Sequence, residues 1–386
     1  MIKINPNNIQ NLERQHLDGL KDIVEARITL KKDSLDTQDD FQLFLDYLKE
    51  NLDTLLCGKR SELQEIIDKI ENHYFISERK LLRILEKRKI GMRERGIRKK
   101  EEIISYLKSF SHEHYLFNYL PSTAYSSVGE FETEVKKLTS NSWKGYVDTL
   151  KEIFNYDKFT QATEGWSAYD LVSLAEVSVC PYCNRSFVTT LQKNGKKTRA
   201  VLDHYYAKAL YPYLALSLYN LIPSCYVCNS SFKGEIDFYK DEAIYPYEEE
   251  FLNLATFKTD FNDETPYDYK YLLGLSKDFK ITFEINTTDE ELERKIKRSI
   301  KTFALEDMYN SHLDIVKDLI RSGIVNNKSR IDEIYEEFSD IFSSRDEVMQ
   351  SLYLNYMDEK NLDKRPFSKL TQDICKELGL LGKPGE

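Results

Sequence analysis

Apolar residues recur every three to four positions through the first part of the chain, a spacing typical of amphipathic helices. The most regular stretch has apolar side chains at Phe41, Phe44, Leu45, Leu48, Leu52, Leu55, Leu56, Leu63, Ile66, Ile67, Ile70 and Tyr74. No proline lies between Pro6 and Pro121, and Ser77 followed by Glu-Arg-Lys-Leu-Leu is typical of a helix start. We therefore expect residues 1–165 to be helical, with a loop over Pro121–Gly129.

The C-terminal third has the same helical spacing, and no proline lies between Pro266 and Pro366. One run departs from it, because apolar and polar residues alternate from Phe279 to Ile285, which predicts a strand. The apolar spacing that follows predicts helices over residues 289–303, 305–323, 327–342 and 345–357.

The middle of the chain has a different pattern. Residues 181–246 hold four of the nine prolines, and the helical spacing stops there. Two short β-prone runs, Ser186–Leu191 and Thr198–Leu202, flank Asn194-Gly195, a dipeptide that favours a tight hairpin turn. A mainly helical protein with a small β-containing centre is therefore expected.

The charge of this central segment differs from that of the rest of the chain. The 386 residues are 41% hydrophobic and 31% charged, which is typical of a soluble protein with two or three domains. The net charge is −10, yet Cys180–Lys233 has seven Lys or Arg against Asp203 alone, a net charge of +6. A second basic run, Arg79–Lys100, has eleven Lys or Arg against two Glu and is either a solvated helix face or a phosphate contact.

Four of the six cysteines form two identical pairs, Cys180-x2-Cys183 and Cys225-x2-Cys228. The chain has no apolar run long enough for a membrane span and no signal-peptide pattern at its start, so we expect it in the cytoplasm with reduced thiols. Two such pairs can supply four thiolates to one structural Zn²⁺. Cys57 and Cys375 stand alone, and each is expected to be a small buried side chain.

Polar residues of another kind lie between and beside these cysteines: Asp203, His204, Asn220, Asn229 and Lys233. The pattern CPYCN…LDHYYAK…YNLIPSCYVCNSSFKG, over about residues 178–236, resembles HNH endonucleases of the zinc-bearing ββα-metal type. Weaker similarity at residues 245–247, 309–312 and 365–369 resembles a bacterial subgroup encoded beside ATPases in phage-defence systems such as Septu and certain retrons.

The resemblance implies a role for each of these residues. His204 matches the general base that deprotonates water, and Asp203 and Asn229 match ligands of a catalytic Mg²⁺ or Mn²⁺ ion, which prefers oxygen donors. Asn220 matches the asparagine that ties the loop backbone and holds the base in position, and Lys233 is expected to contact phosphate. The chain departs from the subgroup at Ala207, where proline is usual, and at Asn229, where many members have histidine.

The expected fold is therefore mainly α with a central ββα-metal (HNH) zinc module, α+β overall. We expect a helical, partner-binding region over residues 1–165, the nuclease module over 166–247 and a mostly helical region with a short β element over 248–386. The resemblance implies an endonuclease for nucleic acid, with DNA favoured and RNA as the alternative substrate, that is gated by a partner ATPase. No membrane contact is expected. The alternative is a non-catalytic zinc-knuckle protein that binds nucleic acid or acts as an adaptor. The remaining histidines, His312 among them, are expected to be structural.

Overall fold

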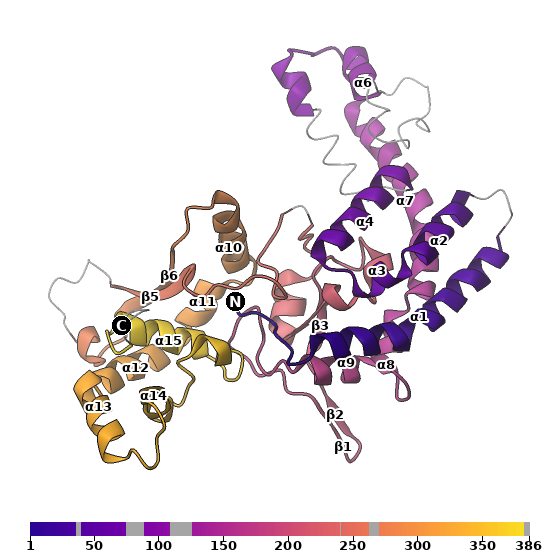
Figure 1. Cartoon of the computed structure of the whole chain (residues 1–386). Helices are drawn as coiled ribbons and strands as arrows, with labels where there is room; N and C mark the ends of the chain where they lie inside the picture. Colours follow the sequence, from indigo (N-terminus) through magenta and orange to yellow (C-terminus); the bar gives the residue numbers. More distant parts are fainter. Residues whose placement is uncertain (36–39, 75–88, 109–125, 240, 262–269, 382–386) are drawn as a thin grey trace. The chain divides into compact units, whose positions relative to one another are not determined.

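The chain folds into two compact units (Figure 1). Unit 1 contains residues 1–12, 166–207 and 221–386, and unit 2 contains residues 13–165 and 208–220. The computed structural model describes residues 1–35, 40–74, 89–108, 126–239, 241–261 and 270–381. The predicted boundary after residue 165 is a boundary between the units, but the predicted nuclease module and C-terminal region form one unit. Residues 208–220, predicted in that module, belong to unit 2.

Unit 2 is helical in its described part. Its helices are α1 (Ile9–Asp33, whose first turn lies in unit 1), α2 (Asp40–Glu50), α3 (Leu52–Cys57), α4 (Arg60–His73), α6 (Lys100–Lys108), α7 (Val128–Ile153) and α8 (Tyr156–Gln161). The short 3-10 helices η3 (Pro212–Leu214) and η4 (Leu218–Asn220) complete it. The helical spacing predicted the α-helices of this unit but not η3 and η4, and the predicted loop ends at Ser127, where α7 begins. The predicted helix start at Ser77, residues 79–88 of the basic run and residues 121–125 of the loop lie outside the described residues.

The core of unit 2 comes from the apolar faces of these helices. Leu45 and Leu48 of α2, Leu55 of α3 and Ile67 of α4 have no exposed surface. Helix ends are fixed locally, because the Ser127 hydroxyl accepts a hydrogen bond from the Glu130 amide at the start of α7. His16 of α1 is also fully buried, and its Nε2 lies 2.7 Å from the Leu216 carbonyl oxygen.

Unit 1 mixes helices with antiparallel strand pairs, so the fold is α+β. Its helices are α9 (Ala168–Ala175), α10 (Glu290–Thr302), α11 (Leu305–Asn310), α12 (Leu313–Val325), α13 (Lys328–Glu337), α14 (Arg345–Tyr353) and α15 (Ser368–Glu377). Its strands are β1 (Leu191–Lys193), β2 (Lys196–Thr198), β3 (Val201–His204), β4 (Leu221–Ser224), β5 (Ala255–Phe261) and β6 (Phe279–Ile285). Three pairs form: β1 with β2, β3 with β4, and β5 with β6.

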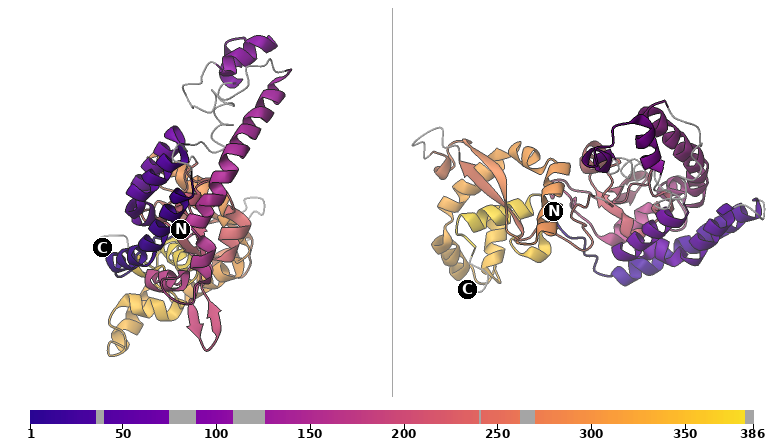
Figure 2. Two further views of the ribbon diagram at one scale, coloured as in Figure 1. Left: turned by 90° about the vertical axis from the view of Figure 1, so that its right-hand side faces the viewer. Right: turned by 90° about the horizontal axis from the view of Figure 1, so that it is seen from above.

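A hydrophobic core of unit 1 lies between the β5–β6 pair and the C-terminal helices (Figures 1 and 2). Phe257 of β5 and Ile281 of β6 pack with Val316 of α12 and with Leu370 and Ile374 of α15. The strand predicted over Phe279–Ile285 is therefore confirmed, and its partner β5 is an element that the sequence analysis missed. The helix predicted over residues 305–323 is divided into α11 and α12 by a turn at residues 311–312.

The hairpin predicted at Asn194-Gly195 is present, but its strands are closer to the turn than expected. Asn194 and Gly195 both have positive φ, 52° and 75°, as a tight hairpin turn requires. The second β-prone run instead ends in β3, which pairs with β4 across an intervening segment of sixteen residues. In the described part of the chain, no helix is both long enough and apolar enough to cross a bilayer.

Candidate metal centre and the adjoining strand pair

The first cysteine pair lies in a tight turn at the beginning of unit 1's central segment. The Asn184 amide donates to the Cys180 carbonyl oxygen (2.8 Å), and the Cys180 amide donates to the Ser186 carbonyl oxygen (2.9 Å). Asn184 adopts a left-handed conformation with φ 50°, which closes the turn after Cys183. The Arg185 amide then lies 3.4 Å from the Cys183 Sγ atom, so the backbone itself supports the sulfur.

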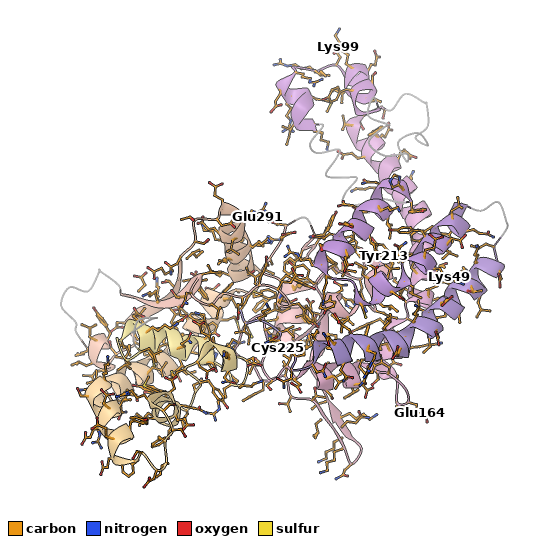
Figure 3. The ribbon with its side chains drawn as sticks, in the orientation of Figure 1. Lys49, Lys99, Glu164, Tyr213, Cys225 and Glu291 are labelled. Atoms are coloured by element: carbon orange, nitrogen blue, oxygen red, sulfur yellow. The ribbon has the colours of Figure 1, made fainter. Side chains whose placement is uncertain are left out.

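The second pair follows β4 directly and leads into η5 (Val227–Lys233), a short π-helix. The Asn229 amide donates to the Cys225 carbonyl oxygen (3.1 Å), and the Cys228 amide lies 3.5 Å from the Cys225 Sγ atom. In each pair, a backbone amide of the turn therefore lies close to one cysteine sulfur. In the first pair this is the Arg185 amide beside the Cys183 Sγ atom, and in the second it is the Cys228 amide beside the Cys225 Sγ atom. Cys225 is labelled within unit 1 in Figure 3.

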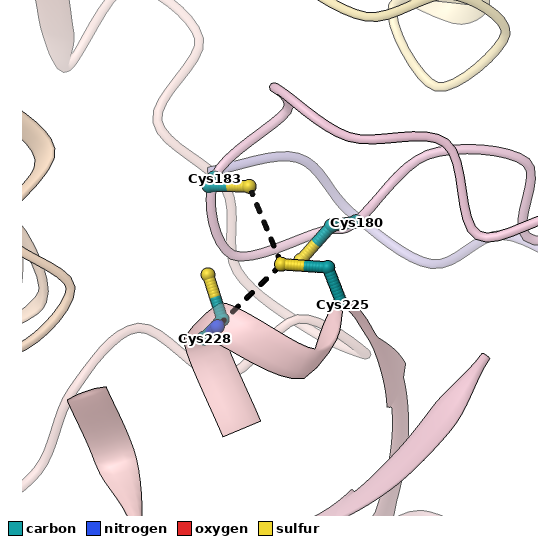
Figure 4. Close-up of side chains that lie close together, drawn as sticks. All are labelled: Cys180, Cys183, Cys225 and Cys228. Carbon is teal, nitrogen blue, oxygen red and sulfur yellow. Dashed lines mark hydrogen bonds between the residues drawn. The ribbon is translucent and has the colours of Figure 1, made fainter. Parts of the chain in front are cut away.

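The four sulfur atoms lie within 4.8 Å of one another and face a common centre (Figure 4). A tetrahedral zinc ion with Zn–S bonds of about 2.3 Å would separate its sulfur ligands by about 3.8 Å. The Cys183 and Cys225 Sγ atoms are 4.0 Å apart, which fits zinc and is about twice a disulfide bond length. All four cysteines are buried, so the donor set fits a closed, structural Zn²⁺ site. In the described residues this is the one cluster of metal-ligand type.

The thiols also perturb one another. Burial raises the pKa of Cys180, whereas hydrogen bonding from Cys180 lowers the pKa of Cys225. Opposite shifts arise because four adjacent sulfurs in a buried space cannot all carry negative charge without a cation. A bound Zn²⁺ would supply that charge and hold all four as thiolates.

Beside this centre, the β3–β4 pair positions Asp203 and His204. Asp203 pairs with Ile222, and His204, the last residue of β3, pairs with Leu221. Asp203 is almost fully buried, and its Oδ2 atom accepts a hydrogen bond from the Tyr182 hydroxyl (2.7 Å). Tyr182 lies between the cysteines of the first pair, so the metal centre and the Asp203 carboxylate are directly connected.

Lys233, at the end of η5, completes this arrangement. Its Nζ atom donates to the His204 carbonyl oxygen (2.5 Å) and lies 3.3 Å from the Asp203 Oδ1 atom. Burial raises the pKa of Asp203, and the Lys233 ammonium group and the Tyr182 hydroxyl oppose that rise. The side chains of Lys233 and Asp203 are 0% and 1% exposed, so this is a buried ion pair. Lys233 was expected to contact phosphate; here it neutralises Asp203 and joins η5 to the end of β3.

The other two residues expected at the site have different surroundings. Asn229 is half-buried on η5, and its side-chain amide lies 3.3 Å from the Ser230 hydroxyl oxygen. Asn220 belongs to unit 2, is fully buried, and donates to the Leu214 carbonyl oxygen (3.0 Å), so it does tie its own loop.

A Mg²⁺ or Mn²⁺ site at Asp203 and Asn229 does not fit this conformation. A divalent cation needs open oxygen donors, and Asp203 already faces the Lys233 ammonium group inside the protein. We therefore derive no chemical step through such an ion.

The three outer segments with weaker similarity all pack on this centre within unit 1. The Tyr309 hydroxyl donates to the Cys183 carbonyl oxygen (2.6 Å), and the Tyr247 hydroxyl donates to the Leu221 carbonyl oxygen (3.0 Å). The Asn184 side chain accepts a hydrogen bond from the Lys369 amide (3.0 Å) and donates to the Leu362 carbonyl oxygen (2.9 Å).

His312 lies in one of these segments and contacts the first cysteine turn. Its Nε2 atom is 3.0 Å from an Arg185 guanidinium nitrogen, and burial together with Arg185 lowers the pKa of His312. An interface histidine was the expectation, and this contact agrees with it. The contact partners Tyr182 and Asn184 were missed in the sequence analysis, although both stand inside or directly after the CPYC motif.

Comparison of the chain with protein-family models, with curated proteins and with solved structures finds no match. The metal centre and the strand pair therefore have to be interpreted from their own chemistry.

Proposed function

We propose that the chain is an endonuclease of the HNH type that hydrolyses phosphodiester bonds in DNA. The observation that carries the proposal is the place of Asp203-His204: at the end of a strand whose partner leads directly into a four-cysteine centre. Lys233 bonds the π-helix that carries Asn229 to the same strand end. The local net charge of +6 over Cys180–Lys233 supports a polyanionic substrate.

His204 is the proposed general base. Its imidazole would take a proton from a water molecule, whose oxygen then bonds to phosphorus as the bond to the leaving 3′ oxygen breaks. Imidazole suits this role because its ordinary pKa lies near neutral pH. His204 is 7% exposed, so a substrate phosphate reaches it only at the surface where β3 ends.

The resemblance to HNH endonucleases is the one reason to propose that cleavage depends on Mg²⁺ or Mn²⁺. In such a state the Lys233 ammonium group would have to move away from the Asp203 Oδ1 atom, because it lies where the ion would bind. A gating ATPase partner likewise rests on the resemblance. Its test is co-purification of the full chain from its native host, a search for an ATPase among the proteins retained, and cleavage measured before and after that ATPase is added.

A second candidate function is a zinc-clamped nucleic-acid-binding or adaptor protein without catalysis. The observation that favours it is the same ion pair, since a fully neutralised Asp203 is not available to a catalytic ion. Both candidate functions require the zinc centre and the basic segment. They differ in whether the chain breaks phosphodiester bonds.

Product analysis separates the two. Zinc-loaded protein is incubated with supercoiled plasmid and with RNA in Mg²⁺ or Mn²⁺, beside His204→Ala and beside His73→Ala, an exposed histidine of unit 2. The nuclease proposal expects nicked and linear plasmid from the wild-type chain and from His73→Ala, but intact plasmid from His204→Ala. Intact nucleic acid in every reaction, together with binding, would favour the adaptor.

A further inference from the structure

The β1–β2 hairpin carries positive charge that the described residues do not balance. All six residues of its two strands are exposed, and three of them are lysines: Lys193, Lys196 and Lys197. No carboxylate in the described part of the chain forms an ion pair with any of the three. The hairpin projects from the remainder of unit 1 as a narrow ribbon (Figures 1 and 2).

The register places two of these charges side by side. Lys193 lies directly opposite Lys196, next to the turn at Asn194-Gly195. Like charges opposite one another destabilise a strand pair, and nothing else in this hairpin offsets the repulsion. The turn residues hold the pair together through their backbone conformation, with φ 52° and 75°. An external anion would therefore stabilise the hairpin.

The charges also lie on both faces of the ribbon. Directly opposed residues share a face and successive residues alternate, so the Lys193–Lys196 pair lies on one face and the Gln192–Lys197 pair on the other. At the base of the hairpin, Lys197 and Arg199 lie 5.8 Å and 5.5 Å from the ring of Tyr169 on α9. These contacts connect the base of the hairpin to α9.

We infer that the β1–β2 hairpin enters the major groove of duplex DNA. The major groove of B-form DNA is about 12 Å wide and admits a two-stranded ribbon with phosphates along both walls. The two strands of such a pair lie about 4.8 Å apart, so the ribbon with its side chains fits that width. The deep, narrow major groove of A-form RNA does not admit such a ribbon. This inference rests on the proposed function for the choice of nucleic acid as partner, and it names the substrate class as B-form duplex.

Binding measurements test it independently of cleavage. The zinc-loaded full chain is titrated, without Mg²⁺ or Mn²⁺, against a labelled duplex DNA and a duplex RNA of the same sequence, and anisotropy is recorded over a range of salt concentrations. The test variant is Lys193→Gln/Lys196→Gln/Lys197→Gln. The matched control is Lys277→Gln/Lys280→Gln/Lys328→Gln, which removes the same charge from exposed positions elsewhere in unit 1.

The expected result is that wild type and control bind duplex DNA at least tenfold more tightly than duplex RNA. The test variant should lose at least tenfold in DNA affinity, and the slope of log affinity against log salt should fall by about 2 to 3. Equal loss in test and control variants, equal binding of DNA and RNA, or no duplex binding by the wild type at low salt would each overturn the inference. If the chain binds duplex DNA through the hairpin lysines but does not cleave plasmid, the inference about the hairpin holds and the nuclease proposal fails.

Discussion

At the scale of single residues, the buried pair of Asp203 and Lys233 is the most informative feature of unit 1. Taking two charges out of water is costly, and the pair repays that cost only through close contact and further hydrogen bonds. Here the Tyr182 hydroxyl and the His204 carbonyl oxygen supply such bonds. The residue types were evident from the sequence, but their pairing was not, because it depends on how η5 packs on β3.

Removing one partner of this pair is expected to destabilise the protein strongly. Lys233→Met leaves the Asp203 carboxylate buried without its counter-charge, and the free energy of unfolding should fall by about 3 to 5 kcal/mol. The matched double variant, Asp203→Asn/Lys233→Met, removes both charges and should recover most of that loss. Urea unfolding of the zinc-loaded proteins measures both values. Loss of less than about 0.5 kcal/mol in the single variant would contradict a buried pair.

His16 predicts a pH dependence of unit 2. Burial lowers the pKa of His16 from 6.5 to about 4, so the folded state holds the neutral ring and protonation favours unfolding. Its contribution to stability is present above pH 6.5 and is lost as pH falls towards 4, a change of about 3 kcal/mol in the free energy of unfolding.

The control for this dependence is His16→Gln, which keeps an N–H donor for the Leu216 carbonyl oxygen but does not titrate. Unfolding is measured by circular dichroism at several pH values for both proteins. The difference between the two proteins should narrow as pH falls below 6.5. Parallel curves from neutral pH to pH 4 would show that His16 is not held neutral.

At the scale of elements, local patterns predicted most helices, the β1–β2 turn and the β6 strand. They missed β5, whose outer backbone is satisfied by side chains of α15: the amides of Phe257 and Thr259 donate to Asp373 and Glu377. Such contacts join residues 116 and 118 positions apart. No periodicity within a short window signals them, which is why the existence of β5 could not be predicted from its own sequence.

The four-cysteine cluster, which fits a Zn²⁺ ion, is the element-scale feature whose loss should matter most. Cys225→Ser, or chelation of the wild type, is expected to lower the zinc content from about one per chain towards zero and to lower the unfolding temperature, because metal binding to such a site contributes directly to folding. Cys57→Ser changes a half-buried cysteine of α3 in unit 2 and should leave zinc content unchanged. The number of zinc ions per chain, measured by mass spectrometry, tests this prediction. Equal content in Cys225→Ser and wild type would refute the four-thiolate site.

At the scale of the whole molecule, chain order is a poor guide to what folds together. Three successive regions were expected, yet unit 1 combines both ends of the chain with its middle. The Ile2 amide donates to the Pro181 carbonyl oxygen, and the Ile4 amide donates to the Pro246 carbonyl oxygen. These two bonds hold the first residues of the chain against the turn of the first cysteine pair and against the segment that contains Pro246. The cysteine spacing predicted that the four thiols lie together, whereas this assembly depends on contacts between segments far apart in sequence.

The net charge of the whole chain, −10, hides an uneven distribution. The segment Cys180–Lys233 has a net charge of +6, and the remaining residues together are acidic. Within unit 1, Lys233 pairs with Asp203, Arg185 contacts His312, and Lys197 and Arg199 lie over the ring of Tyr169. The hairpin lysines remain exposed. Nucleic-acid contact is therefore expected to be local and sensitive to salt.

His204 is proposed to act as a general base in phosphodiester hydrolysis. Its most direct measurement is the initial rate at which the zinc-loaded chain nicks supercoiled plasmid in Mn²⁺, with His204→Ala assayed alongside. Loss of a general base slows such reactions by about 100-fold or more, so we predict at least that ratio between the two rates. Equal rates would contradict that role, and so would no nicking by the wild-type chain both without and with a co-purified ATPase partner.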